Sequence, residues 1–196
     1  MTRLNSTINT FLCSFVLFSF SISAQTQDSL AVFNGVAFGM HNNDDQAQEA
    51  SATVSSNQRV SELVDSLLTA IINDYANKKR ISVSPELKQS FLVTFGESSS
   101  LPVQKQQALA EKFVKQWLVE KSLYGEFGGT VVYRPTNPQM PIEAYLKLLK
   151  QYEAQGDLVF TDEDFSQAFW SLFSPPYQLA LEAEAVDYSS PWWAKS

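Results

Sequence analysis

The chain has 196 residues and carries 14 Lys and Arg against 21 Asp and Glu, which gives a formal net charge of -7 at pH 7. Such an acidic protein lacks the basic stripe that displaces counterions from phosphates, so we expect no nucleic-acid partner. With one cysteine, Cys13, a disulfide within the chain is impossible, and one histidine, His41, leaves few residues for a metal site. We therefore predict no metal and no cofactor.

Residues 1–24 are typical of a secretory signal peptide. Arg3 precedes the apolar run Phe11–Ile22, and the small residues Ser23 and Ala24 follow it. The run is too short to cross roughly 30 Å of hydrocarbon, which needs about 20 residues. We therefore expect cleavage near Ser23 or Ala24, a periplasmic or extracellular location, and no integral membrane segment after cleavage.

Residues 25–58 are predicted to form a flexible N-terminal segment and linker. The stretch 41–58 is polar and has Val54 as its only large aliphatic residue, so it cannot bury enough apolar surface to offset its ordering entropy. Before it, apolar residues alternate along 30–40 around Asn34 and Gly35. That pattern leaves two alternatives open, an added strand or a poorly ordered tail.

Residues 59–196 are predicted to form one helical domain. The first helix shows an apolar face over four turns, made by Val60, Leu63, Val64, Leu67, Leu68, Ile71, Ile72 and Tyr75. A second helix begins at the N-cap Ser84, with Pro85 in the first helical position, and ends at Gly96. Between them, the cations of 78–80 complement the negative end of the first helix.

Three further helices follow at the same spacing. The third extends to about Leu123, and the fourth begins at Ile142, after three prolines that we expect to forbid regular structure, and ends at Gly156. Thr161 with the acids of 162–164 predicts a cap and an acidic first turn for a fifth helix. Residues 177–186 are predicted to form one more helix.

Two short β-branched or aromatic stretches, near 130–133 and 158–160, are predicted to be strands. A strand, a helix and a strand in this order favour a parallel pair with a right-handed crossover. The predicted fold class is therefore mainly α, a compact bundle of five to six helices with a minor two-stranded β element.

The stretch Tyr75–Leu87, read as YANKKRISVSPEL, resembles the N-terminal helical region of SurA-type periplasmic chaperones, and the likeness extends loosely over 60–123. In that family a helix ending in Tyr-Ala is followed by an Ile-x-Val link and a capped helix. The resemblance implies binding of unfolded outer-membrane polypeptides, although the parvulin domain of those chaperones is absent here. The later chain, with Gly128 and Gly129 before a strand, resembles small uncharacterised secreted bacterial proteins.

The sequence predicts no catalytic residues. His41 lies in the predicted linker, where no rigid frame holds it beside a nucleophile. Carboxylates could pair between Glu120 and Glu126 or within 162–164, but acid and base chemistry also needs a cleft that separates their pKa values. We therefore expect a protein that is not an enzyme, with a carboxylate-dependent hydrolase as a remote alternative.

The candidate binding residues are four tryptophans. Trp117 and Trp170 lie on helical faces, while Trp192 and Trp193 follow Pro191 near the end of the chain. The terminal pair would form either a docked clasp or exposed anchors for a partner. The leading hypothesis is a chaperone-like binding protein for nonnative or envelope polypeptides that uses a groove between the first and third helices. The alternative is an accessory envelope component that docks to one fixed protein partner.

Overall fold

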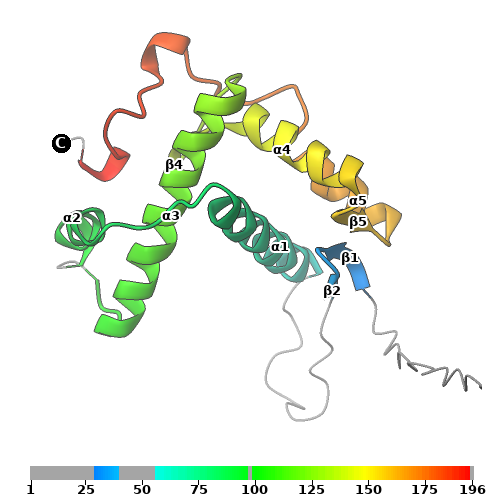
Figure 1. Cartoon of the computed structure of the whole chain (residues 1–196), viewed down its shortest axis with the longest axis horizontal. Coiled ribbons are helices and arrows are strands. Elements are labelled where there is room, and N and C mark those ends of the chain that lie inside the picture. The colour runs from blue at the N-terminus through cyan, green and yellow to red at the C-terminus, as the bar shows by residue number, and fades with distance from the viewer. Residues whose placement is uncertain (1–28, 40–55, 97–98, 195–196) are drawn as a thin grey trace, which may run out of the picture.

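The computed structural model describes residues 29–39, 56–96 and 99–194 (Figure 1). Its helices are α1 (Ser56–Lys78), α2 (Pro85–Phe95), α3 (Val103–Phe127), α4 (Ile142–Gln155) and α5 (Glu163–Ser171). Its strands are β1 (Ser29–Phe33), β2 (Val36–Gly39), β3 (Val132–Arg134), β4 (Asn137–Met140) and β5 (Leu158–Phe160). The predicted class, mainly α with a minor β element, is confirmed.

None of the helices within the described residues has the length and apolar composition needed to cross a membrane.

The predicted apolar face of α1 is buried along its length. Leu67 and Ile71 are fully buried, and Tyr75 closes the same face near the end of the helix. Residues three and four apart lie on one side of a helix, so this stripe meets a continuous partner surface. The partner surface includes β1, β2 and α3.

Helix ends follow the predicted chemistry. Leu87 N donates to Ser84 Oγ over 3.2 Å at the start of α2. Phe165 N donates to Asp162 Oδ1 over 2.7 Å at the start of α5. Each side chain satisfies an amide that has no partner inside its helix. At the end of α4, Gly156 adopts φ of 79°, the left-handed conformation that stops a helix.

Two hydrophobic clusters share α3, the long central helix of Figure 1. The first cluster contains α1, α4, α5 and β1, together with Val119 and Leu123 of α3. The second contains α2, the earlier α3 residues Val114 and Trp117, and the end of the chain. In Figure 1, α2 and the C-terminal segment lie on one side of α3, and α1 and α4 lie on the other. The long helix therefore connects a large core with a small aromatic one.

The predicted parallel pair of strands is wrong. β3 pairs antiparallel with β4, and β5 pairs antiparallel with β1, so two sheets form with orders β3-β4 and β2-β1-β5. Only residues 135 and 136 separate β3 from β4, and a short turn closes at lower entropic cost than a helical crossover. Pro138 lies within β4, where we expected no regular structure, because a two-stranded sheet has free edges that tolerate proline.

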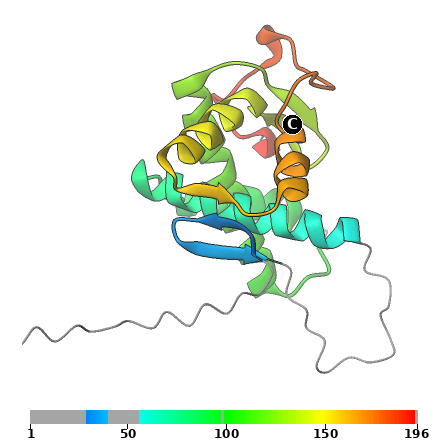
Figure 2. The ribbon, with the colours of Figure 1, turned by 90° about the vertical axis from the view of Figure 1, so that its right-hand side faces the viewer.

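Residues 29–39, which lie within the segment 25–58 predicted to be flexible, form a hairpin. Asn34 and Gly35 have φ of 48° and 78°, as the tight turn between two strands requires. Ala31 and Phe33 are buried, and β1 pairs with β5 on its other side. Figure 2 shows the hairpin beside β5 and along α1. Of the two alternatives for 30–40, the structure therefore has the added strand. Helix α1 begins at Ser56, inside the predicted linker. The predicted signal peptide and most of the linker, including His41, lie outside the described residues.

The helix predicted over 177–186 is wrong. A bridge joins Ala180 to Val132, and Tyr133 N donates to Leu179 O over 2.9 Å. Within 177–186 the helical part is one 3-10 turn, η1 (Ala183–Ala185). A second 3-10 turn, η2 (Trp192–Ala194), lies at the end of the described chain. Pairing with β3 satisfies backbone groups that a helix would have satisfied internally.

Candidate functional site

The four predicted binding tryptophans lie in two places. Trp117 and Trp193 are buried together in the second cluster, with ring centroids 5.8 Å apart and nearly perpendicular planes. Trp192 lies next to them and packs 5.7 Å from Phe95. Trp170 is half-buried on α5 against the first cluster, 5.7 Å from Phe160. The structure thus brings three of the four tryptophans together.

The C-terminal segment 186–194, here called the clasp, docks on α2 and α3. The Trp193 ring lies 5.4 Å from the Phe91 ring, and Thr94 Oγ1 donates to Trp193 O over 3.2 Å. Tyr188 is buried in the same cluster, 5.2 Å from Tyr124. Of the two alternatives for the terminal tryptophans, the structure has the docked clasp.

The start of the clasp is held by the buried amide of Gln139 on β4. Gln139 Nε2 donates to Asp187 O over 3.0 Å, and Asp187 N donates to Gln139 Oε1 over 2.6 Å. Tyr188 also donates its hydroxyl proton to the backbone carbonyl of Gln139. These bonds to Asp187 engage its backbone rather than its side chain, so they do not depend on its identity.

A buried carboxylate, Glu120, joins α3 to β4 and α4. Its side chain is 1% exposed, and Oε1 accepts from Asn137 Nδ2 at 2.7 Å, from Tyr145 Oη at 3.0 Å and from Gln116 Nε2 at 3.0 Å. Burial raises the pKa of Glu120 to about 7, although the three donors oppose the rise. A buried acid of this kind makes stability depend on pH.

Glu120 and Glu126, which the sequence suggested as a possible pair, contact different groups. Glu126 lies in an exposed position and bonds Tyr75 and Lys79, whereas Glu120 bonds buried amides and Tyr145. Helical spacing carried a signal for burial that we did not use, because Glu120 lies three residues from both Trp117 and Leu123 of the buried face. Neither arrangement places two acids at one reaction centre.

Exposed apolar side chains are frequent in the stretch of chain that runs from the end of α2 into the first turns of α3. Among the described residues, ten large hydrophobic side chains are exposed, and five of them lie between 93 and 109, with exposures of 37% to 69%. We call these five the α2–α3 patch: Val93, Phe95, Leu101, Val103 and Leu109. Phe95 and Leu109 line one small hollow of about 50 Å³ with Phe91 of the aromatic cluster. Sequence periodicity missed the patch because it placed Phe95 and Leu109 on inward faces.

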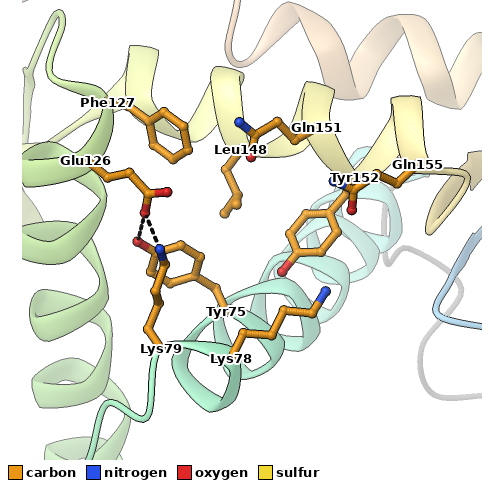
Figure 3. A pocket seen from close by; sticks show the side chains of 9 residues that line it. All are labelled: Tyr75, Lys78, Lys79, Glu126, Phe127, Leu148, Gln151, Tyr152 and Gln155. Carbon is orange, nitrogen blue, oxygen red and sulfur yellow. Dashed lines mark hydrogen bonds and ion pairs between the residues drawn. The ribbon is translucent and has the colours of Figure 1, made fainter.

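A pocket of about 290 Å³ lies where the end of α1 faces α3 and α4 (Figure 3). Its lining is Tyr75, Lys78, Lys79, Glu126, Phe127, Leu148, Gln151, Tyr152 and Gln155. Figure 3 shows Phe127 and Leu148 projecting toward the space opposite the Tyr75 ring. Apolar and polar side chains therefore line the cavity together.

Opposite charges balance at the rim of this pocket. Glu126 Oε2 accepts from Tyr75 Oη and pairs with Lys79 Nζ, both at 2.8 Å (Figure 3), and the bond from Lys79 lowers the pKa of Glu126. Lys78 Nζ lies 2.9 Å from Asp74 Oδ2 and 4.6 Å from the centre of the Tyr152 ring. Burial raises the pKa of Tyr75 to about 12. The pKa of Glu126 is lowered and that of Tyr75 is raised, so both pKa values move away from neutral pH. The pocket therefore suits an uncharged apolar group better than proton transfer.

A smaller hollow of about 230 Å³ lies between α1 and α3, where we predicted an apolar groove. Ile72 and Ala108 contribute apolar surface, but Asn73, Glu111 and Lys115 lie beside them. Lys115 Nζ donates to Asn73 Oδ1 over 3.1 Å across the two helices. The exposed lining of the hollow is nevertheless mainly apolar, so a hollow of the predicted kind lies between these two helices.

The remaining sequence candidates have structural partners or lie outside the described residues. Asp162 caps α5, as reported above, and Glu163 and Asp164 occupy the first turn of that helix. Within the described part of the chain, no three His, Cys, Asp or Glu side chains gather as a metal site would require. His41 lies outside it.

No protein-family model, curated protein or solved structure matches this chain. The resemblance of 60–123 to SurA-type chaperones accordingly stays a prediction.

Proposed function

We propose that this protein is an exported, non-catalytic binding protein that captures apolar segments of nonnative polypeptides on the α2–α3 patch. The observation that carries the proposal is the concentration of exposed apolar side chains between Val93 and Leu109. Isolated exposed hydrophobic residues are ordinary on a protein surface, whereas a group of them is typical of an interaction site. The SurA-like sequence 75–87 precedes and enters α2, so the resemblance and the patch concern the same part of the chain.

The expected binding is weak and reversible. Each patch side chain is already partly covered, so completing its burial contributes on the order of 1 kcal/mol, or about 5 kcal/mol for all five. Association itself costs roughly 4 to 15 kcal/mol in lost freedom, so further contacts must assist. The pocket of Figure 3, lined by both apolar and polar side chains, has room for one additional side chain. Low affinity for many segments is what a chaperone-like protein needs.

The two alternatives receive less support. Docking to one fixed partner was expected to use 30–40 or the terminal tryptophans, yet the hairpin and Trp193 are packed into the fold. A carboxylate-dependent hydrolase needs two acids in one cavity, and Glu120 does not line the pocket that contains Glu126.

The test is aggregation of a denatured outer-membrane protein, followed by light scattering with and without the mature chain. We expect suppression by the unaltered protein and its loss in a variant carrying Val93→Ser and Val103→Ser. The matched control carries Val36→Ser and Val159→Ser, which are exposed valines on the hairpin and β5, and should still suppress aggregation. No suppression at several-fold molar excess, or equal suppression by both variants, would remove the proposal.

A further inference from the structure

We propose that the clasp occupies, within its own chain, the groove in which α2 and α3 bind a polypeptide segment bearing aromatic side chains. This inference rests on the proposed function and names the class of segment that is bound. The captured segment would take the position that Trp193 and Trp192 now fill, and the clasp would leave.

The groove under the clasp is aromatic. Trp193 meets Phe91 and Trp117 edge to face, with ring centroids 5.4 Å and 5.8 Å away. Phe113 stacks on the far side of Phe91 at 5.4 Å. Perpendicular and offset ring pairs add about 0.5 to 1.5 kcal/mol beyond burial, so this groove favours an aromatic side chain over an aliphatic one.

The polar contacts of the clasp recognise backbone. Thr94 binds the carbonyl of Trp193, and the Gln139 amide binds both the N–H and the carbonyl of Asp187. Every polypeptide carries such backbone groups, and a segment that adopts the same turn as η2 would present them at the same positions. A combination of backbone bonds with pockets for spaced side chains is a general mode of peptide recognition.

The docked clasp also leaves two polar atoms unsatisfied. The indole N–H groups of Trp117 and Trp193 are buried and have no hydrogen-bond acceptor among the described residues. Each such group costs roughly 1 to 3 kcal/mol. The clasp is therefore held less tightly than its aromatic burial alone would give, which makes exchange with another segment feasible.

Phe95 belongs to the α2–α3 patch and also borders the groove under the clasp. Phe95 packs on Trp192 of the clasp while 37% of it stays exposed, and it shares a hollow with Phe91 and Leu109. A segment first held on the patch thus lies next to the clasp. Because a tethered segment has an effective concentration in the millimolar range, the clasp competes strongly with any free segment.

The experiment uses a fluorescent peptide with the sequence of residues 186–194, VDYSSPWWA, and the full chain. Peptide binding is measured by anisotropy for the unaltered protein and for a variant carrying Trp192→Ala and Trp193→Ala. If the closed clasp predominates, emptying the groove should tighten binding by about tenfold or more. A peptide with both tryptophans replaced by Ala should not compete. Equal affinity of the two proteins would overturn the inference, as would no binding to a variant that circular dichroism shows to be folded.

The unaltered protein provides a second measurement in case the variant does not fold. Excess peptide should raise hydrogen exchange in the protein's own residues 186–194 while α2 and the first half of α3 stay protected. Unchanged exchange in that segment would overturn the inference. If the peptide displaces the clasp but aggregation is not suppressed, the proposed function alone fails. If aggregation is suppressed through Val93 and Val103 but the peptide does not bind, this inference alone fails.

Discussion

Replacing Glu120 by Gln should remove a pH dependence from the stability of the fold. Burial raises the pKa of this carboxyl from an ordinary 4.5 to about 7, so the folded state holds the proton more tightly than the unfolded state. The stability that this group contributes is fully present below about pH 4.5 and is lost as the pH rises through about 7. At about 1.4 kcal/mol for each tenfold difference in proton affinity, the loss amounts to roughly 3 kcal/mol.

The assay is urea unfolding, followed by tryptophan fluorescence, at several pH values between about 5 and 8. Gln keeps the shape of the side chain and an oxygen that accepts from Asn137 and Tyr145, but it does not titrate. The free energy of unfolding of Glu120→Gln should therefore rise relative to the unaltered protein by roughly 3 kcal/mol across this range.

Glu126→Gln is the matched control on the same helix. The pKa of Glu126 is lowered, as are those of Asp74 and Glu143, so their contributions are lost only as the pH falls below their ordinary values of 3.8 to 4.5. The difference between this control and the unaltered protein should stay constant between about pH 5 and 8. Parallel pH profiles for Glu120→Gln and the unaltered protein would refute the reasoning.

Other substitutions test the fold by urea unfolding at one pH. Phe33→Ala should lower the free energy of unfolding by about 3 to 5 kcal/mol because the ring is buried. Val36→Ala, at an exposed position of the same hairpin, should change it by less than about 0.5 kcal/mol. Equal losses would mean that the hairpin is not part of the core. Ser84→Ala should cost about 1 kcal/mol through the lost N-cap, and an unchanged midpoint would argue against that cap. Gly156→Ala should destabilise the fold by about 1 kcal/mol because φ at this residue is 79°. Gly125→Ala inside α3 should instead stabilise it by about 0.5 to 1 kcal/mol. A change of the same sign for both variants would contradict the assigned backbone conformations.

The helices could be predicted from the sequence because their signals are local. The apolar stripe of α1, the Ser84 cap and the Gly156 stop each depend on residues within a few turns of one another. Of the eight apolar side chains on this face of α1, five are buried and three are partly buried, which leaves few other structures for that stretch. Five of the six expected helices are present among the described residues.

Strand pairing could not be predicted in the same way because its partners are distant. β5 pairs with β1, more than a hundred residues earlier, and no local pattern states which edge a three-residue strand will join. The Asn34-Gly35 turn was a usable signal for the hairpin, but it was outweighed by the polar stretch that follows. The last expected helix failed for a related reason, since residues near Ala180 bond to β3 instead of to themselves.

The candidate site was predicted only in part. The importance of the aromatic residues was visible, and Trp117 and Trp193 do meet, but their composition cannot tell a docked clasp from an exposed anchor. The exposed patch arises because α2 is short and covers only part of α3, which depends on how the helices pack. Glu120 was named as an acid but not as a buried one, since its burial needs β4 and α4 around it.

The most direct test of the central claim is site-specific photo-crosslinking to a denatured client polypeptide. A crosslinking amino acid is placed at Val93 or Val103 in the patch, and at Val36 or Val159 on the hairpin and β5 as matched exposed positions. The account predicts strong crosslinks from the first two positions and few from the last two. Equal crosslinking from all four, or crosslinks mainly from Val36 and Val159, would contradict it.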